Sequence, residues 1–224
     1  MADCPFEDDD AVMLRLAQFV ATRICHDLSG PLGGLGAALG EIDDDPTAID
    51  LARDAALVLR QRLALLRTAC GMSAGPLRRT DLRDIAQGLA NAPRLRLELD
   101  ALADDPPFPP AGAAVVASAL MLAAESLPGG GMLALAGNPG DVVVVTIAGP
   151  RAAWPIGLGA MLASKVEARA AAAAFVATSG LRGLSAPLTA LLAHQSGVRA
   201  SLLLAGGTEA LPPLVLDFSS LPPA

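Results

Sequence analysis

The chain has 224 residues, of which 53% are hydrophobic, and this is enough to bury one large core or two small ones. Its formal net charge is -7, and no run of Lys and Arg is interleaved with aromatic residues, so we expect no nucleic-acid surface. The 3 cysteines lie far apart and fit neither a disulfide framework nor a zinc site. No apolar stretch reaches the roughly 18 residues of a membrane span, and the first residues are acidic where a signal peptide is basic. We therefore expect a cytoplasmic protein that does not contact a membrane.

Apolar residues recur with a helical period from Ala11 to Leu39, and this pattern predicts a long amphipathic helix. With about 100° of rotation per residue, His26 points away from the apolar stripe and into solvent. An exposed histidine carries little functional information by itself. Its surroundings are more informative, because five glycines crowd the same segment and each costs about 1 kcal/mol relative to Ala in a helix. Either they let a partner's backbone approach closely, or they loosen a helix that is kinked at Pro31.

A second amphipathic pattern follows an acidic turn and covers Ala48 to Leu66. Asp45 is the expected N-cap of this helix, with Pro46 at its first helical position. Two amphipathic helices cannot close a core by themselves, so a four-helix bundle formed with a second copy of the chain is the natural completion. The sequence therefore predicts a helical hairpin that makes a homodimer.

The hydrophobic pattern changes after the Gly and Pro residues of 71–76, which predict a division of the chain into domains at 1–74 and 75–224. Alternating or continuous apolar runs predict strands, and longer periodic segments predict helices. The expected order is helix 80–91, strand 94–99, helix 113–127, strands 132–136 and 141–148, helices 158–177 and 186–195, and strands 199–204 and 213–218. This order predicts an α+β fold in which an α/β sandwich follows the hairpin.

The order His26-Asp27-Leu28-Ser29-Gly30-Pro31-Leu32 resembles the phosphoacceptor box of sensor histidine kinases. In that family the histidine lies on the first helix of a dimerising hairpin, and an ATP-binding α/β sandwich follows. The nucleotide-binding residues of the family are missing here. Ala123, Ala124 and Glu125 stand where a pair of Asn residues is expected, and 146–149 offers no carboxylate for adenine. We therefore expect neither ATP binding nor any intrinsic cofactor or metal.

A phosphoacceptor helix joined to a degenerate ATP-binding domain resembles the ChpT-type histidine phosphotransferases of alphaproteobacterial phosphorelays. The resemblance extends over most of the chain, although only the box around His26 is specific. It implies a homodimeric transferase that moves phosphoryl groups between proteins without hydrolysing ATP. The implied partners are the receiver domain of a hybrid histidine kinase and the receiver domains of response regulators. The Mg²⁺ ion would belong to the receiver.

The resemblance assigns the phosphoacceptor role to His26, whose neutral imidazole is a nucleophile. Asp27 either orients the ring, stabilises its developing charge or is an ordinary solvated acid. Arg23 and Thr22 are candidates for contacts with the phosphoryl oxygens. The surface that docks the receiver is expected to include Phe19, Thr22, Gly30 and Gly33.

Two other functional classes remain compatible with the same sequence. A sensor kinase with a diverged nucleotide pocket would label its own His26 from ATP. A non-catalytic adaptor would bind receivers and transfer nothing, although docking alone does not require a histidine. Other features carry little chemistry: Gly129-Gly130-Gly131 lacks the Lys of a phosphate-binding loop, and His194 lies on an apolar helix where a structural role is expected.

Overall fold

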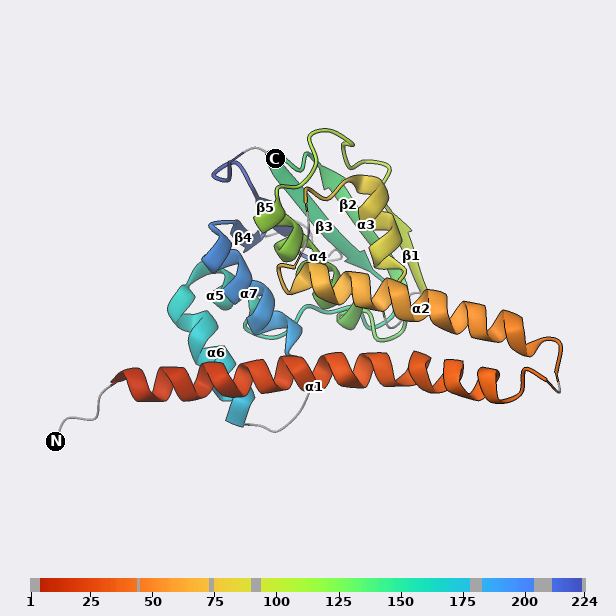
Figure 1. Ribbon diagram of the computed structural model, residues 1–224. Helices are drawn as coiled ribbons and strands as arrows, with labels where there is room; N and C mark the ends of the chain where they lie inside the picture. The colour runs from red at the N-terminus through yellow and green to blue at the C-terminus, as the bar shows by residue number, and fades with distance from the viewer. Residues whose placement is uncertain are drawn as a thin grey trace.

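The structure is a computed structural model that describes residues 5–43, 45–72, 75–89, 94–177, 183–203 and 211–222, with side chains described from residue 10 onward. Helices α1 (Pro5–Gly40) and α2 (Ala48–Ala69) form an antiparallel hairpin (Figure 1). The tip of this hairpin extends beyond the remainder of the molecule. Within the described residues, no helix combines the length and hydropathy that crossing a membrane requires.

The remaining elements make a mixed α/β unit. Its helices are α3 (Arg79–Ala86), α4 (Pro110–Glu125), α5 (Leu158–Ala163), α6 (Lys165–Ala177) and α7 (Ser185–Ser196). Its strands are β1 (Leu95–Glu98), β2 (Gly131–Gly137), β3 (Val142–Ala148), β4 (Arg199–Leu202) and β5 (Leu214–Asp217). The 5-stranded sheet has the order β1-β2-β3-β5-β4, and only the β1–β2 pair is parallel. This agrees with the α+β class expected from the sequence.

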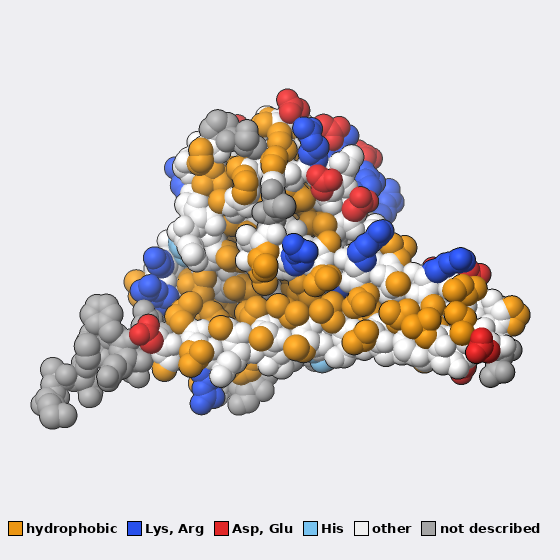
Figure 2. Space-filling view, viewed as in Figure 1, with side chains coloured by type: hydrophobic (Ala, Val, Ile, Leu, Met, Phe, Trp, Pro, Cys, Tyr) orange, Lys and Arg blue, Asp and Glu red, His pale blue; other side chains and the backbone are white. Residues whose placement is uncertain are grey.

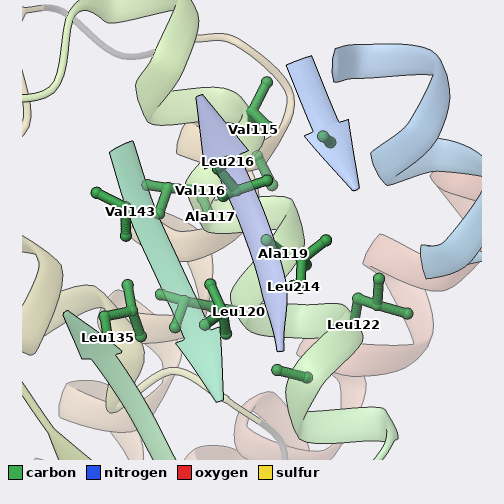
Figure 3. Close-up of a cluster of buried hydrophobic side chains, with 14 of the residues drawn as sticks. Val115, Val116, Ala117, Ala119, Leu120, Leu122, Leu135, Val143, Leu214 and Leu216 are labelled. Carbon is green, nitrogen blue, oxygen red and sulfur yellow. The ribbon is translucent and has the colours of Figure 1, made fainter. Parts of the chain in front are cut away.

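Helix α4 is the centre of the main core. Most of its residues are buried, which explains why its sequence is apolar on all sides rather than along one stripe. Val115, Val116 and Leu120 pack close to Val143 of β3 and Leu216 of β5 (Figure 3). Strand β3 alternates between buried and half-buried residues, so one face of the sheet is covered by helices. A buried hydroxyl pair, Ser118 with Thr189 at 2.8 Å, links α4 to α7.

The hairpin is fastened to the α/β unit along much of its length. Near the end of α2, Leu65 and Ala69 belong to the main core. On α1, Leu16 is buried in a second cluster with Ala172 and Leu184 from the α/β unit. A close approach also occurs at Gly88, where an added Cβ would lie 2.4 Å from the carbonyl oxygen of Gln61 on α2. The hairpin is thus packed against the unit that follows it.

Several element boundaries differ from those expected. Helix α1 continues through Pro31 as one element. Helix α2 begins after Thr47 rather than after Asp45, although the Asp45 carboxylate accepts hydrogen bonds from the Thr47 N–H and hydroxyl, both at 2.8 Å. The expected helix 158–177 is broken at Ser164, whose backbone is extended, into α5 and α6. Helix α3 ends at Ala86, and Asn91 lies outside the described residues.

Asp217 at the end of β5 is expected to make the stability of the fold depend on pH. Its carboxylate accepts hydrogen bonds from the Ser219 hydroxyl at 2.6 Å and backbone N–H at 3.0 Å, and it pairs with Arg199 at 2.7 Å. These contacts, those of Ser219 first, lower the pKa of Asp217 below its ordinary value. Because the pKa is lower in the folded state, the stabilisation is present above the unfolded pKa of about 3.9 and is lost as the pH falls through the folded value.

We expect Asp217→Ala to lower the Tm by about 3 °C at neutral pH, the effect of losing one hydrogen-bonded carboxylate from a domain of this size. The difference from the wild type should shrink towards zero in acid. Thermal unfolding followed by circular dichroism at a series of pH values measures both. Asp100→Ala is the matched control, since Asp100 is 98% exposed and 3.6 Å from Arg83. A difference that persists undiminished in acid would contradict the assignment.

Candidate functional site

His26 lies on the outer face of α1, and 73% of its side chain is exposed. Its Nδ1 atom is 3.2 Å from Oδ1 of Asp27, whose side chain is only 13% exposed. A carboxylate can only accept a hydrogen bond, so in the neutral ring Nδ1 carries the proton and Nε2 keeps the lone pair. The arrangement presents a nucleophilic nitrogen to solvent on a ring held by its neighbour.

Asp27 is itself held by an ionic chain that crosses to the α/β unit. Its Oδ2 atom accepts a hydrogen bond from Nε of Arg23 at 2.7 Å, one helical turn away. The same guanidinium places Nη1 2.8 Å from Oε1 of Glu125, the last residue of α4. Burial lowers the pKa of Arg23, but the hydrogen bond to Asp27 and the charges of Glu125 and Asp27 outweigh it and raise the pKa above the ordinary value. Arg23 is therefore a permanent cation between two carboxylates.

Arg62 of α2 supports the same position from the second helix of the hairpin. Its Nη1 donates to the backbone carbonyl of Asp27 at 2.6 Å. Its Nε is buried and makes no hydrogen bond with the described residues. Arg23, Asp27, Arg62 and Glu125 line a cavity of about 220 Å³ between the hairpin and the α/β unit. The site is thus charged and recessed on one side of α1, whereas the His26 ring lies exposed.

The other expected site residues on α1 have partners within the chain. Thr22 is exposed, and its hydroxyl donates to the carbonyl of Gln18 at 2.8 Å. Phe19 is half-buried and meets the ring of Phe175 edge to face, with centroids 5.2 Å apart. Within the chain, Arg23 has two carboxylates as partners, and its expected contact with phosphoryl oxygens stays a prediction. The structure therefore places Phe19 and Arg23 on the side of α1 that meets the α/β unit.

Gly30 and Gly33 lie on the exposed surface that follows His26. An added Cβ at either position would meet nothing within 4 Å, and the same holds for Gly34, Gly36 and Gly40. Packing inside the chain therefore does not require these glycines. Their cost to the helix is unexplained by the isolated chain, which is what a surface reserved for a partner's backbone would show.

The described residues offer no group of three or more His, Cys, Asp and Glu side chains that could hold a metal ion. Ala123 and Ala124 of α4 are buried in the core. His194 is half-buried, and its Nε2 lies 2.9 Å from the carbonyl oxygen of Met161, a structural contact far from His26 in the sequence.

Comparison with known proteins adds one observation about this fold. The chain resembles a solved bacterial phosphotransferase. The alignment has a TM-score of 0.63 and 19% sequence identity, and it covers 91% of this chain and 95% of the other. At this identity the similarity shows a shared fold, and it extends over both the hairpin and the α/β unit. No family model and no curated protein matches the sequence.

Sequence reasoning overlooked two residues of this site, Arg62 and Glu125. Arg62 was one of several arginines on α2, and its partner is a backbone carbonyl that no side-chain pattern reveals. In the sequence, Glu125 attracts attention only because it stands where an Asn that binds the nucleotide is expected. A signal did exist, because Glu125 is the one charged residue of α4 and ends an otherwise apolar helix.

Proposed function

We propose that this protein is a histidine phosphotransferase of a multistep phosphorelay in the cytoplasm. His26 accepts a phosphoryl group from the receiver domain of a hybrid histidine kinase and passes it to the receiver of a response regulator. The observation that carries the proposal is the exposed imidazole whose Nδ1 is bonded to Asp27, leaving Nε2 free. The shared fold with a structure described as a bacterial phosphotransferase supports it.

The chemistry is a balanced phosphoryl exchange. The Nε2 lone pair attacks the phosphorus of the receiver's aspartyl phosphate, a P–N bond forms, and the P–O bond to the aspartate breaks to release its carboxylate. The hydrogen bond from Nδ1 to Asp27 disperses the positive charge that the ring acquires. Transfer to the second receiver runs the same step in reverse. Any Mg²⁺ ion would be bound by the receiver's own carboxylates, and this chain supplies the nucleophile and its orientation.

We also propose that two copies of the hairpin assemble into a four-helix bundle. Of the thirteen large hydrophobic side chains found exposed in the described residues, nine lie on the hairpin: Met13, Leu14, Leu32, Leu39, Ile42, Ile49, Leu51, Leu57 and Leu63. Figure 2 shows hydrophobic side chains gathered along it. Leu14, Leu32 and Leu39 are rotated about 220–240° from His26 around the helix axis. A second copy would therefore cover this stripe and leave His26 accessible.

Transfer of a radioactive phosphoryl group separates the three candidate functions. The protein is incubated with labelled ATP alone, and separately with a receiver domain phosphorylated on its aspartate. A histidine phosphotransferase acquires label only from the receiver. A diverged sensor kinase acquires it from ATP, and an adaptor binds the receiver without acquiring label. Label from ATP, or none from any receiver that binds, would overturn the proposal.

The proposed dimer predicts the effect of shortening one side chain of the apolar stripe. Leu32 is 58% exposed in the single chain. We expect Leu32→Ala to raise the dissociation constant of the dimer roughly 30-fold, the equivalent of about 2 kcal/mol of lost burial. Sedimentation velocity over a dilution series measures it. Leu203→Ala is the control, because Leu203 is also 58% exposed but lies outside the hairpin. Equal behaviour of the two variants would argue against this stripe as the interface.

A further inference from the structure

We infer that Glu125 of α4 is a positioning residue for His26, and that it acts through Arg23 and Asp27. The inference rests on the proposed function and assigns a role in it to the α/β unit. The chain of contacts is continuous: Glu125 Oε1 to Arg23 Nη1 at 2.8 Å, Arg23 Nε to Asp27 Oδ2 at 2.7 Å, and Asp27 Oδ1 to His26 Nδ1 at 3.2 Å. Each carboxylate oxygen of Asp27 thus has a separate partner.

The geometry explains why Asp27 needs this support. Asp27 and His26 are neighbours in the sequence, and adjacent helical residues point about 100° apart. A free Asp27 side chain would have several rotamers, of which few reach the imidazole. Arg23 fixes Oδ2 and so directs Oδ1 towards His26. Arg23 in turn has a long and flexible side chain, and Glu125 immobilises its far end from another element.

The position of Glu125 is unfavourable for α4 itself. A carboxylate in the last turn of a helix faces the negative end of the macrodipole, where it costs about 0.3–1 kcal/mol. The remainder of α4 is uncharged, and its core-facing residues need no ion. Neither the stability of α4 nor its packing therefore accounts for Glu125. Among the described residues, Glu125 forms its ion pair with Arg23 of α1, which indicates that its role is to position a residue of the hairpin.

The experiment compares Glu125→Ala with Glu98→Ala. Glu98 is the matched control, since it also pairs with an arginine, Arg96 at 2.9 Å, but lies on β1 away from His26. The first readout is the set of ¹⁵N chemical shifts of the His26 ring at alkaline pH, where they report which nitrogen carries the proton. We expect one tautomer, protonated at Nδ1, in the wild type and in Glu98→Ala. We expect a mixture of tautomers in Glu125→Ala.

The second readout is the rate of phosphoryl transfer from a receiver domain. We expect Glu125→Ala to lower the rate about 10-fold, the lower end of the loss seen when a hydrogen-bond partner that orients a metal-bound imidazole is removed. Glu125→Gln keeps an acceptor for Arg23 and should recover part of this loss. In a background of Asp27→Ala, Glu125→Ala should have no further effect, because the chain of contacts is already broken.

Three outcomes would overturn the inference. The first is a single Nδ1-protonated tautomer in Glu125→Ala, and the second is an equal loss of rate with and without Asp27. The third is an equal loss in Glu98→Ala, which would indicate a general structural effect. The tautomer measurement needs no phosphoryl donor. It therefore decides the role of Glu125 even if His26 proves unable to accept a phosphoryl group, and that failure would count against the proposed function alone.

Discussion

Replacing His26 with Gln is expected to abolish phosphoryl acceptance, lowering the rate of transfer by more than about 10³-fold. Gln preserves polarity and has a favourable helix propensity, and the position is 73% exposed, so the fold should be unaffected. The loss would come from the missing nucleophile alone. Transfer from a labelled receiver, resolved on a gel, gives the rate, and circular dichroism checks the fold.

His194→Gln is the control for this experiment, because His194 is the other histidine of the chain. Its ring is bonded to the carbonyl of Met161, so its removal should leave phosphoryl acceptance near the wild-type rate. Label that persists in His26→Gln and disappears in His194→Gln would place the phosphoryl group on His194 and contradict the proposal. A normal rate in both variants would exclude a phosphohistidine altogether.

The second large effect is expected at Gly33, where a bulky side chain should block the receiver. Gly33 lies about 20° from His26 around the helix axis, two turns further along α1. Nothing in the chain lies within 4 Å of a Cβ added there, so Gly33→Trp should fold normally. The indole would occupy the space that a docking backbone needs. We expect binding of the receiver to weaken roughly 100-fold, the equivalent of about 2.7 kcal/mol, as measured by isothermal titration calorimetry.

The same variant should leave the proposed dimer intact, since Gly33 lies about 100–120° around the helix axis from Leu14, Leu32 and Leu39. Arg96→Trp provides the control for a bulky exposed side chain, because Arg96 is 80% exposed on β1. It should bind the receiver as tightly as the wild type. If Gly33→Trp binds equally well, the receiver docks elsewhere and the glycines need another explanation.

The fold was largely predictable because its signals are local. Every described helix and strand has a counterpart in the apolar periodicity, and the turn at 137–140 joins the strands expected on either side. The differences fall at element boundaries. Helix α2 begins at Ala48 rather than at Pro46, and the extended backbone of Ser164 divides α5 from α6. Such boundaries depend on single hydrogen bonds and torsions that periodicity does not record.

The candidate site was predictable only along α1. The helical wheel placed His26 in solvent, which the structure repeats, because that inference needs one helix alone. It could not anticipate that Arg23 pairs with Glu125, since these residues are 102 positions apart in the sequence and only the tertiary fold joins them. For the same reason it could not anticipate that the ring of Phe19, whose wheel position is close to that of His26, contacts Phe175.

Two contacts, the Leu16 cluster and the Arg23–Glu125 ion pair, hold α1 against the α/β unit and limit how the two can move. Leu16, which precedes His26 on α1, is buried among residues of that unit. Arg23, one helical turn before His26, is paired with Glu125. Swinging the unit away from the hairpin would require dismantling an apolar cluster and separating two opposite charges. We therefore expect His26 to keep the same position and orientation when it accepts the phosphoryl group and when it passes it on. The donor and acceptor receiver domains would then have to bind the same rigid surface. Discrimination between them would depend on the side chains at the interface rather than on a conformational change.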